Sequence, residues 1–508
     1  MTRSLISPRR WALALAFAST CAVPLAHAVS INPRGTGQVL IYPYYTVNGG
    51  QQTLITIGND SGRGKAVRVR FSEGRNGRTV LAFNLYLAPR DVWSGAIFQS
   101  PSSEAAALLT DDDSCTFPLL KTSTLVQQLP DGRRYIAFFD YAYGYRTSPE
   151  DAGPDGLGRT REGYIEAIEM GSIETGSTLA TAVSPGADGT PKDCSSLEER
   201  WNGGDWSTNP NLDLANPTGG LYGGLMVVNV AAGTLFSVPA TAIEDFRVDP
   251  RDEPRGSTSS VVLHRMPIEQ APLLSDAVTD PVLGTAAADV DLGGRNIHVE
   301  YPSGSRGIDA VTAVLMSSTV AGDYVLEAAA GASTEWILTM PTRRFYVDEA
   351  IVGSSAIAPF TRVYPKSGAE SSACMAVPYV AYGRNARQSS AADPQILLCF
   401  GAQALPFSMT NVAAPADVLG SSLVAAASIA TDQASGMAQL MTGSHGSPTA
   451  FAMRPADDGT VLKGLPVMGF VVFDYINSNV QAGVLANYSG AVPLRSSTVC
   501  ARDGAACP

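Results

Sequence analysis

Short stretches of alternating apolar and polar residues constrain the fold of this 508-residue chain more than any other feature. In the clearest stretch, Val67, Val69 and Phe71 would lie on one face of an extended strand, whereas Arg68 and Arg70 would lie on the other. The next apolar run, after a Gly-Arg-Asn-Gly turn, has the same two-residue period. Short strands at this spacing favour an all-β, mainly antiparallel fold over alternating strands and helices.

Two β-rich domains are predicted behind a leader. Residues 29–250 have the strand spacing and the long loops of a β-sandwich-like domain, and residues 251–508 form a second β-rich domain with a few short helices. The boundary is set in a charged, proline-containing stretch without apolar periodicity. Helical patterns are best in residues 308–316 and 416–430.

Residues 1–28 have the organisation of a secretory signal peptide. An Arg-Arg pair precedes a short apolar run, and Ala26-His27-Ala28 supplies the small residues that a signal peptidase requires. Cleavage is therefore expected after Ala28. The Arg-Arg pair leaves twin-arginine export open as an alternative route. No later apolar run reaches the ~18 residues of a spanning helix, so no membrane span is expected in the mature chain.

Six cysteines remain once Cys21 leaves with the leader. An even number of cysteines in an exported protein indicates disulfides, although six cysteines allow about 15 pairings. Pairing of sequence neighbours is the preferred arrangement: Cys115 with Cys194, Cys374 with Cys399, and Cys500 with Cys507.

The chain is acidic, with 35 basic and 47 acidic side chains and a formal charge of −12. Three of the basic residues are leader arginines, so the mature chain has 32 basic against 47 acidic residues and a charge of −15. Nucleic acid is therefore not an expected partner.

Four segments resemble a group of exported proteobacterial proteins of uncharacterised function. They are residues 41–45 (Ile-Tyr-Pro-Tyr-Tyr), 65–71 (Lys-Ala-Val-Arg-Val-Arg-Phe), 83–93, and 485–490 (Leu-Ala-Asn-Tyr-Ser-Gly), the last being similar to a C-terminal signature. The resemblance implies a secreted, periplasmic or cell-surface protein of a Gram-negative bacterium. It implies no catalytic residues.

One acidic loop has the spacing of a calcium site. Asp151, Asp155 and Glu162 match ligand positions 1, 5 and 12 of a calcium-binding loop, but glycine at two other positions and the lack of flanking helices argue against an EF-hand. The expectation is therefore that the chain has no cofactor, with a non-EF calcium site at this loop as the alternative. The acidic run at residues 111–113, next to a cysteine, is a second candidate of the same kind.

Histidine is scarce: after the leader only His264, His298 and His445 remain. Because histidine is the commonest general base and metal ligand, this scarcity weakens most hydrolase interpretations. His298 and Glu300 share one strand face and could share a metal, but a solvated face is the favoured interpretation. The Ser-His pair in residues 443–447 is favoured as a loop, since a nucleophile elbow needs serine at its centre.

A basic segment is the one local charge anomaly. Arg68, Arg70, Arg75 and Arg78 are its candidate binding residues, expected to form a basic stripe for an acidic segment of the same or a neighbouring subunit, or for an anionic glycan. The alternative is that arginine simply replaces lysine, because the chain has 30 arginines and 5 lysines.

Two groups of tyrosines could line a carbohydrate platform, although packing in the core is the commoner use of tyrosine. They are Tyr42, Tyr44 and Tyr45, and Tyr141, Tyr143 and Tyr145.

The sequence favours an exported β-rich protein that acts by surface contacts rather than by catalysis. Self-association, or adhesion to an envelope glycan or protein, is the expected activity. The alternative is an exported hydrolase of polysaccharides or esters, since paired carboxylates cleave glycosides without histidine. Its candidate carboxylates are Asp140, Asp151, Asp155 and Glu162.

Overall fold

The computed structural model describes residues 27–507 apart from short segments. The segments left out are 145–149, 250–259, 302–306, 390–393, 410–413, 426–427, 444–450, 478–480, 482–483 and 485. Four sequence predictions therefore lie outside the described residues: most of the leader, Tyr145, the Ser-His pair at 444–445, and the stretch that holds the domain boundary.

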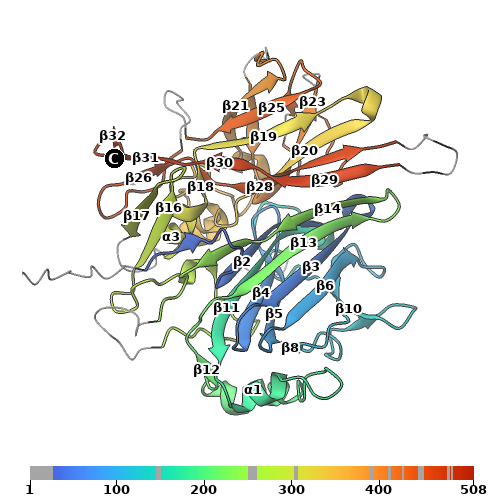
Figure 1. Ribbon diagram of the computed structural model, residues 1–508, viewed down its shortest axis with the longest axis vertical. Helices are drawn as coiled ribbons and strands as arrows, with labels where there is room; N and C mark the ends of the chain where they lie inside the picture. Colours follow the sequence, from blue (N-terminus) through green and yellow to red (C-terminus); the bar gives the residue numbers. More distant parts are fainter. Residues whose placement is uncertain are drawn as a thin grey trace, which may run out of the picture.

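The chain is all-β, and its larger sheets are mainly antiparallel (Figure 1). The first sheet has eight strands, and in spatial order they are β1 (Ser30–Ile31), β15 (Thr241–Glu244), β2 (Val39–Thr46), β11 (Glu162–Ile173), β4 (Lys65–Glu73), β5 (Thr79–Leu87) and β8 (Cys115–Phe117), with β12 (Leu214–Ala215) paired to β11. The second sheet has seven strands: β14 (Thr234–Pro239), β13 (Leu221–Asn229), β3 (Gln52–Asn59), β6 (Val92–Gln99), β7 (Ala106–Leu109), β10 (Arg134–Ala137) and β9 (Gln127–Gln128).

These two sheets pack face to face through the side chains that the alternation marked as apolar. Val67, Val69 and Phe71 from the first sheet share one buried cluster with Ile55 and Trp93 from the second. The two-residue period of a strand delivers every second side chain to this layer.

Two five-stranded sheets make the upper part of the molecule in Figure 1. One contains β22 (Gln395–Leu398), β21 (Met375–Gly383), β25 (Ser435–Met441), β19 (Thr319–Val325) and β30 (Arg495–Ser497). The other contains β24 (Ile429–Ala430), β23 (Ala402–Ser408), β20 (Ala332–Thr339), β28 (Met468–Tyr475) and β29 (Tyr488–Pro493). The pair β23–β24 is parallel.

Three small sheets join the larger ones. They are β16 (Ala286–Asp291) with β17 (Asn296–Tyr301), β18 (Met316–Ser317) with β27 (Leu465–Pro466), and β26 (Val461–Lys463) with β31 (Val499–Arg502) and β32 (Ala505–Ala506). Apolar contacts also connect the two halves of the chain, because Ile337 and Phe470 belong to the same buried cluster as Val67.

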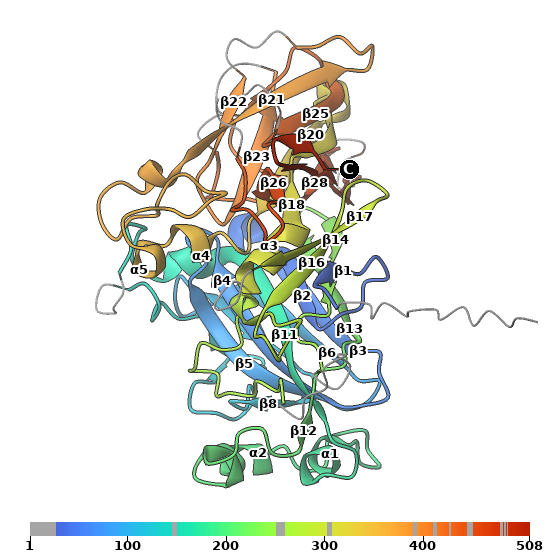
Figure 2. The same ribbon diagram turned by 90° about the vertical axis from the view of Figure 1, so that its left-hand side faces the viewer.

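The helices are short. The α-helices are α1 (Thr178–Val183), α2 (Ser196–Trp201), α3 (Gly307–Leu315), α4 (Arg344–Val347) and α5 (Glu349–Val352). The 3-10 helices are η1 (Asn48–Gly50), η2 (Leu157–Arg161), η3 (Asp205–Ser207), η4 (Leu274–Asp276), η5 (Ala328–Ala330) and η6 (Glu370–Ala373). Figure 2 places α4 and α5 beside the junction of the upper and lower sheets, and α1 and α2 at the bottom.

One of the two helix predictions is confirmed. The pattern in residues 308–316 corresponds to α3. The prediction for residues 416–430 is wrong over its described part, which is turn and irregular structure ending in β24. Two backbone N–H groups there, those of Val418 and Leu419, donate to the carboxylate of Glu335 at 2.7 and 3.3 Å. This buried acceptor satisfies the N–H groups of a turn, so the backbone here is paired without a helix.

Three disulfides connect Cys115 with Cys194, Cys374 with Cys399, and Cys500 with Cys507. The pairing of sequence neighbours is therefore the arrangement that the structure contains. Among the described residues, none of the helices has the length and apolarity that crossing a bilayer requires.

Candidate functional site

An apolar groove runs along the outer edge of β5. Its floor is formed by residues 79–83 of that strand. One wall comes from residues 266–270 and the other from the irregular chain around Leu125 and Tyr141. The groove has a volume of about 530 Å³, within the range of ~300–1,000 Å³ that ligand sites occupy.

Large apolar side chains on the groove walls are open to solvent. The exposed fractions are 89% for Ile268, 68% for Tyr141 and 43% for Leu125. The Tyr141 ring stacks on the Phe139 ring with centroids 4.9 Å apart and an interplanar angle of 7°. Apolar side chains gathered in one concave site mark an interaction surface more strongly than isolated exposed residues do.

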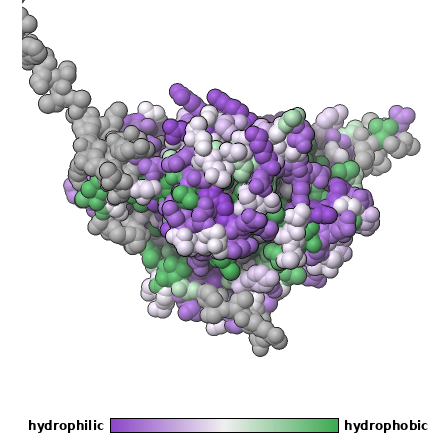
Figure 3. Space-filling model, turned by 90° about the horizontal axis from the view of Figure 1, so that it is seen from below, coloured by the Kyte–Doolittle hydropathy of each residue, from purple (hydrophilic) through white to green (hydrophobic). Residues whose placement is uncertain are grey.

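Figure 3 shows the molecule from below: hydrophilic residues predominate on this face, and apolar residues form separate small groups on it.

Comparison with protein-family models, with curated proteins and with solved structures found no match. The resemblance to exported proteobacterial proteins therefore stays a prediction.

The arginines predicted as a basic stripe lie inside the molecule. The Arg68 guanidinium donates to the carbonyls of Arg265, Met266 and Glu269 at 2.8–3.0 Å. Burial lowers the pKa of Arg68 to about 9. Arg70 donates to the Pro272 carbonyl at 2.9 Å and pairs with Glu166 at 3.3 Å. The alternation assigned these side chains to the correct face, but an irregular segment covers that face.

The other two predicted arginines join a buried ionic cluster. Arg78 pairs with Asp348 at 3.0 Å, and the partly buried Arg75 pairs with Glu370. Acidic partners from the same chain therefore satisfy this basic segment. The sequence alone left open whether such partners would come from this chain, another subunit or a glycan.

Arg159 is the centre of that ionic cluster. Its guanidinium binds Glu73 at 2.9 and 3.0 Å and Asp151 at 2.6 and 2.8 Å, and it lies 4.2 Å from the centre of the Tyr143 ring. Burial alone would lower the pKa of Arg159, but the two carboxylates outweigh it and hold the pKa above its ordinary value. Sequence reasoning did not single out Arg159, because nothing local shows that it is buried.

The predicted calcium residues have separate environments. Asp151 is bound by Arg159 and by the Asn76 amide at 3.0 Å. Glu162 is buried and accepts from Tyr44 at 2.7 Å and from residues 421 and 422. Asp155 is exposed. Among the described residues, no group of three or more potential ligands is arranged to hold a metal ion.

Two candidate carboxylates of the alternative hydrolase line one small cavity. Asp155 and Glu162 meet there with Glu104, and its volume is about 210 Å³. Asp140 and Asp151 do not line it. The hydrogen bonds to Glu162 give that carboxylate a structural use in joining the two halves of the chain.

The remaining acidic and histidine candidates form ion pairs or hydrogen bonds with nearby residues. In the run at 111–113, Asp113 pairs with Lys121 at 2.7 Å. His298 lies 3.6 Å from Glu300, so these two residues share one strand face as predicted. The carboxylate of Asp289, on the neighbouring strand, lies 2.7 Å from His298. The hydrogen bond that His298 donates to the Asp289 carboxylate raises the pKa of His298 above its ordinary value.

The tyrosine groups divide between core and surface. Tyr42, Tyr44 and Tyr45 are fully buried and form no surface platform. Tyr143 is buried under Arg159, which leaves Tyr141 as the exposed aromatic of the second group among the described residues.

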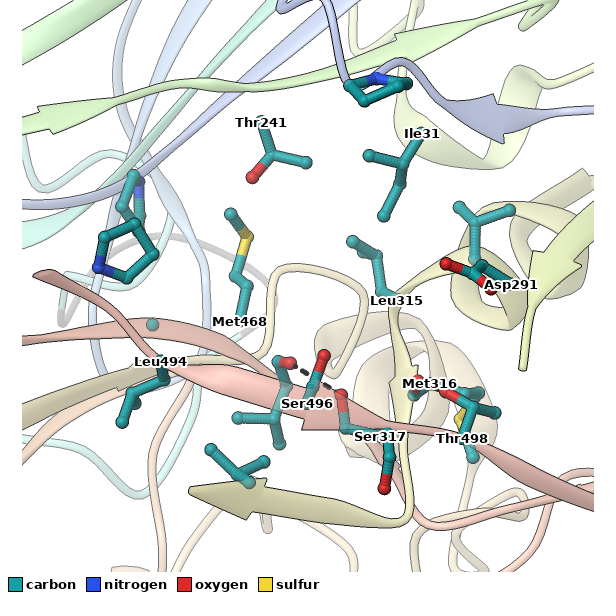
Figure 4. A pocket seen from close by; sticks show the side chains of 18 of the residues that line it. Ile31, Thr241, Asp291, Leu315, Met316, Ser317, Met468, Leu494, Ser496 and Thr498 are labelled. Carbon is teal, nitrogen blue, oxygen red and sulfur yellow. Dashed lines mark hydrogen bonds between the residues drawn. The ribbon is translucent and has the colours of Figure 1, made fainter. Parts of the chain in front are cut away.

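A second cavity, of about 520 Å³, lies between the lower and upper sheets (Figure 4). Ile31, Thr241, Leu315 and Met468 face one another across it. Its lining includes the carboxylate of Asp291, which already accepts the N–H groups of two glycines at 2.8 Å. Among the described residues, no basic side chain or histidine lines it. Its most exposed large apolar side chain among the described residues is Ile31, which is 42% exposed, against 89% for Ile268 in the groove.

Proposed function

We propose that this chain is an exported binding protein that acts by surface contacts rather than by catalysis, and that the apolar groove along β5 is its contact site. The observation that carries the proposal is the exposure of Ile268, Tyr141 and Leu125 around one concave site. Such sites gain affinity by desolvating apolar side chains when a partner covers them.

Export to an oxidising compartment supports this role. The structure contains three disulfides, and disulfides persist outside the reducing cytosol. We propose cleavage of the leader after Ala28, so that the mature chain begins at Val29. Val29 already has a fixed position, since its N–H donates to the Ala287 carbonyl at 2.9 Å and its carbonyl accepts from Asp289 at 2.9 Å. N-terminal sequencing of the exported protein tests this cleavage site.

The partner that we propose is an envelope protein or glycan of a Gram-negative bacterium, or a second copy of the chain. Cosedimentation with isolated envelopes and analytical ultracentrifugation measure these associations. The Ile268→Asn variant should weaken the association by about tenfold or more, because it places an amide on the most exposed apolar wall residue.

Val230→Asn is the matched control for that experiment. Val230 is 77% exposed and lies outside the groove, so the same change in polarity should leave binding unchanged. Equal effects of the two variants would contradict the groove as contact site. Purified protein that neither self-associates nor binds envelopes would contradict the proposed function.

The second candidate function is hydrolysis of a polysaccharide or an ester. The cavity that brings Asp155 together with Glu162 is the observation that favours it. An activity found with such substrates and lost in Asp155→Asn would establish it, since Asp155 is exposed and its amide variant should fold normally.

A further inference from the structure

The outer edge of the first sheet is interrupted beside β5. On its inner side β5 pairs with β4 over most of its length. On its outer side β8 pairs only with residues 84–86. Nearer the N-terminal end of β5, the Phe139 N–H donates to the Val80 carbonyl at 2.9 Å. Among the described residues, no strand pairs with β5 at Ala82, between these two contacts.

The backbone groups of Ala82 face this interruption. The Val80 carbonyl points outward, because it accepts the N–H of Phe139. Alternate residues of a strand direct their N–H and C=O groups toward the same edge. Ala82 therefore directs a donor and an acceptor outward, and it lines the groove. An unpaired strand edge is a template for pairing with another chain.

Apolar side chains stand on both sides of this polar edge. Ile268 belongs to one wall, and Leu125 and Tyr141 to the other. A ligand that fits this pattern has one backbone-like donor and acceptor flanked by apolar groups. An extended peptide has both features, because its hydrogen-bonding edge lies between side chains that alternate above and below.

We propose that the groove binds a short extended peptide segment of a partner protein, which fills the interruption in the sheet at Ala82. The peptide residue opposite Ala82 donates its N–H to the Ala82 carbonyl and accepts the Ala82 N–H, while its apolar neighbours contact the walls. From Val80 to Asn84 the edge spans roughly 13 Å at ~3.3 Å per residue, which leaves room for about three peptide residues. This inference rests on the proposed function and specifies its partner.

Fluorescence polarisation with two labelled pentapeptides tests the pairing on the intact protein. Both have the sequence Thr-Val-Phe-Val-Thr with blocked ends, and the second is N-methylated at its three central residues. The methylated peptide keeps the side chains but loses the donors. We expect it to bind about tenfold or more weakly, because each lost hydrogen bond costs ~1 kcal/mol and the methyl groups obstruct the edge.

Two variants test the protein side. Ala82→Pro removes the outward N–H but keeps the Ala82 carbonyl and the pairing of β5 with β4. It should therefore weaken the unmethylated peptide by about fivefold, the equivalent of one hydrogen bond of ~1 kcal/mol, and so reduce the difference between the two peptides. Proline is tolerated where the N–H of an edge strand is unpaired. Ala82→Val keeps the N–H, so it measures separately what a larger side chain at this position does to binding. Should Ala82→Pro fail to fold, Ile268→Asn at the wall provides an independent test, since it should weaken the unmethylated peptide.

The outcomes separate this inference from the proposed function. Equal binding of both peptides to the wild-type protein, or no binding of either, overturns strand pairing. If laurate displaced both peptides equally well, the groove would be a site for acyl chains. That result would also overturn strand pairing. The proposed function survives these results if envelope binding or self-association still depends on Ile268.

Discussion

His264 gives the fold a measurable sensitivity to acid. It is fully buried among Tyr86, Trp201 and Trp206. The Trp201 Nε1–H donates to the Tyr86 hydroxyl at 3.3 Å, and that hydroxyl lies 2.8 Å from His264 Nε2. Nδ1 contacts the Pro210 carbonyl and so must donate. These partners fix a neutral ring with Nε2 as the acceptor, and a second proton would break the bond from Tyr86 and bury a charge.

The size of the effect follows from the pKa. Burial lowers the pKa of His264 from 6.5 to about 3. The unfolded chain therefore binds a proton below pH 6.5 that the folded chain refuses until about pH 3. The stabilisation is complete above pH 6.5 and is lost as the pH falls, at ~1.4 kcal/mol per pH unit. Between pH 6.5 and 4 the loss of unfolding free energy should be about 3 kcal/mol.

Urea denaturation of the wild type and of His264→Asn at pH 7 and pH 4 measures this loss. The variant should be less stable at pH 7 by about 2–4 kcal/mol, because it loses ring packing, and should lose about 3 kcal/mol less than the wild type on acidification. His298→Asn is the control. In the wild type the pKa of His298 is raised, which is the opposite of the shift at His264. His298 therefore contributes stability below pH 6.5, and this contribution disappears as the pH rises through the folded-state pKa. Parallel losses in the wild type and His264→Asn would refute the reasoning.

Other predictions follow from buried groups. Glu335→Gln should remove the loss of about 3 kcal/mol that ionisation of Glu335 contributes in urea titrations between pH 4.5 and 7, because burial raises the Glu335 pKa from 4.5 to about 7 and ionisation costs stability as the pH rises. At pH 4.5 the variant should be the less stable protein, since its amide oxygen can accept from only one of the N–H groups of Val418 and Leu419. Replacing Cys115 and Cys194 by serine should cost about 4–5 kcal/mol in the same assay, given a sequence separation of 79. Arg159→Met should cost about 3–5 kcal/mol, since it leaves two carboxylates buried without their cation. EDTA should leave the Tm unchanged in calorimetry, because Arg159 occupies Asp151; a lower Tm would support the calcium prediction.

Local periodicity predicted most of the strands but not what covers them. The alternation assigned Val67 and Val69 to the core and Arg68 to the opposite face, and the structure agrees. Arg68 is nonetheless buried, because residues 265–272 cross that face and supply carbonyl acceptors. This covering segment has no apolar period and lies almost 200 residues away in sequence, so no local pattern reports the contact.

The groove could not be predicted for the same reason. Tyr141 was among the candidate residues, but Ile268 is a single apolar residue in an irregular stretch and gave no signal. The site arises where three distant segments meet at an unpaired strand edge. Pairing partners depend on the whole sheet order, whereas the two-residue period describes one strand at a time.

Glu162 makes the first half of the chain dependent on the second. Its carboxylate accepts from Tyr44 and Asn48, which precede it, and also from Ser421 and Ser422, about 260 residues later. Until residue 422 arrives, a chain emerging from its N-terminus would have a buried carboxylate with only part of its donors. Folding of the first two sheets on their own is then less favourable than folding of the whole chain. A segment near residue 422 thus completes a site that begins at Tyr44, and the two halves should unfold together rather than one after the other.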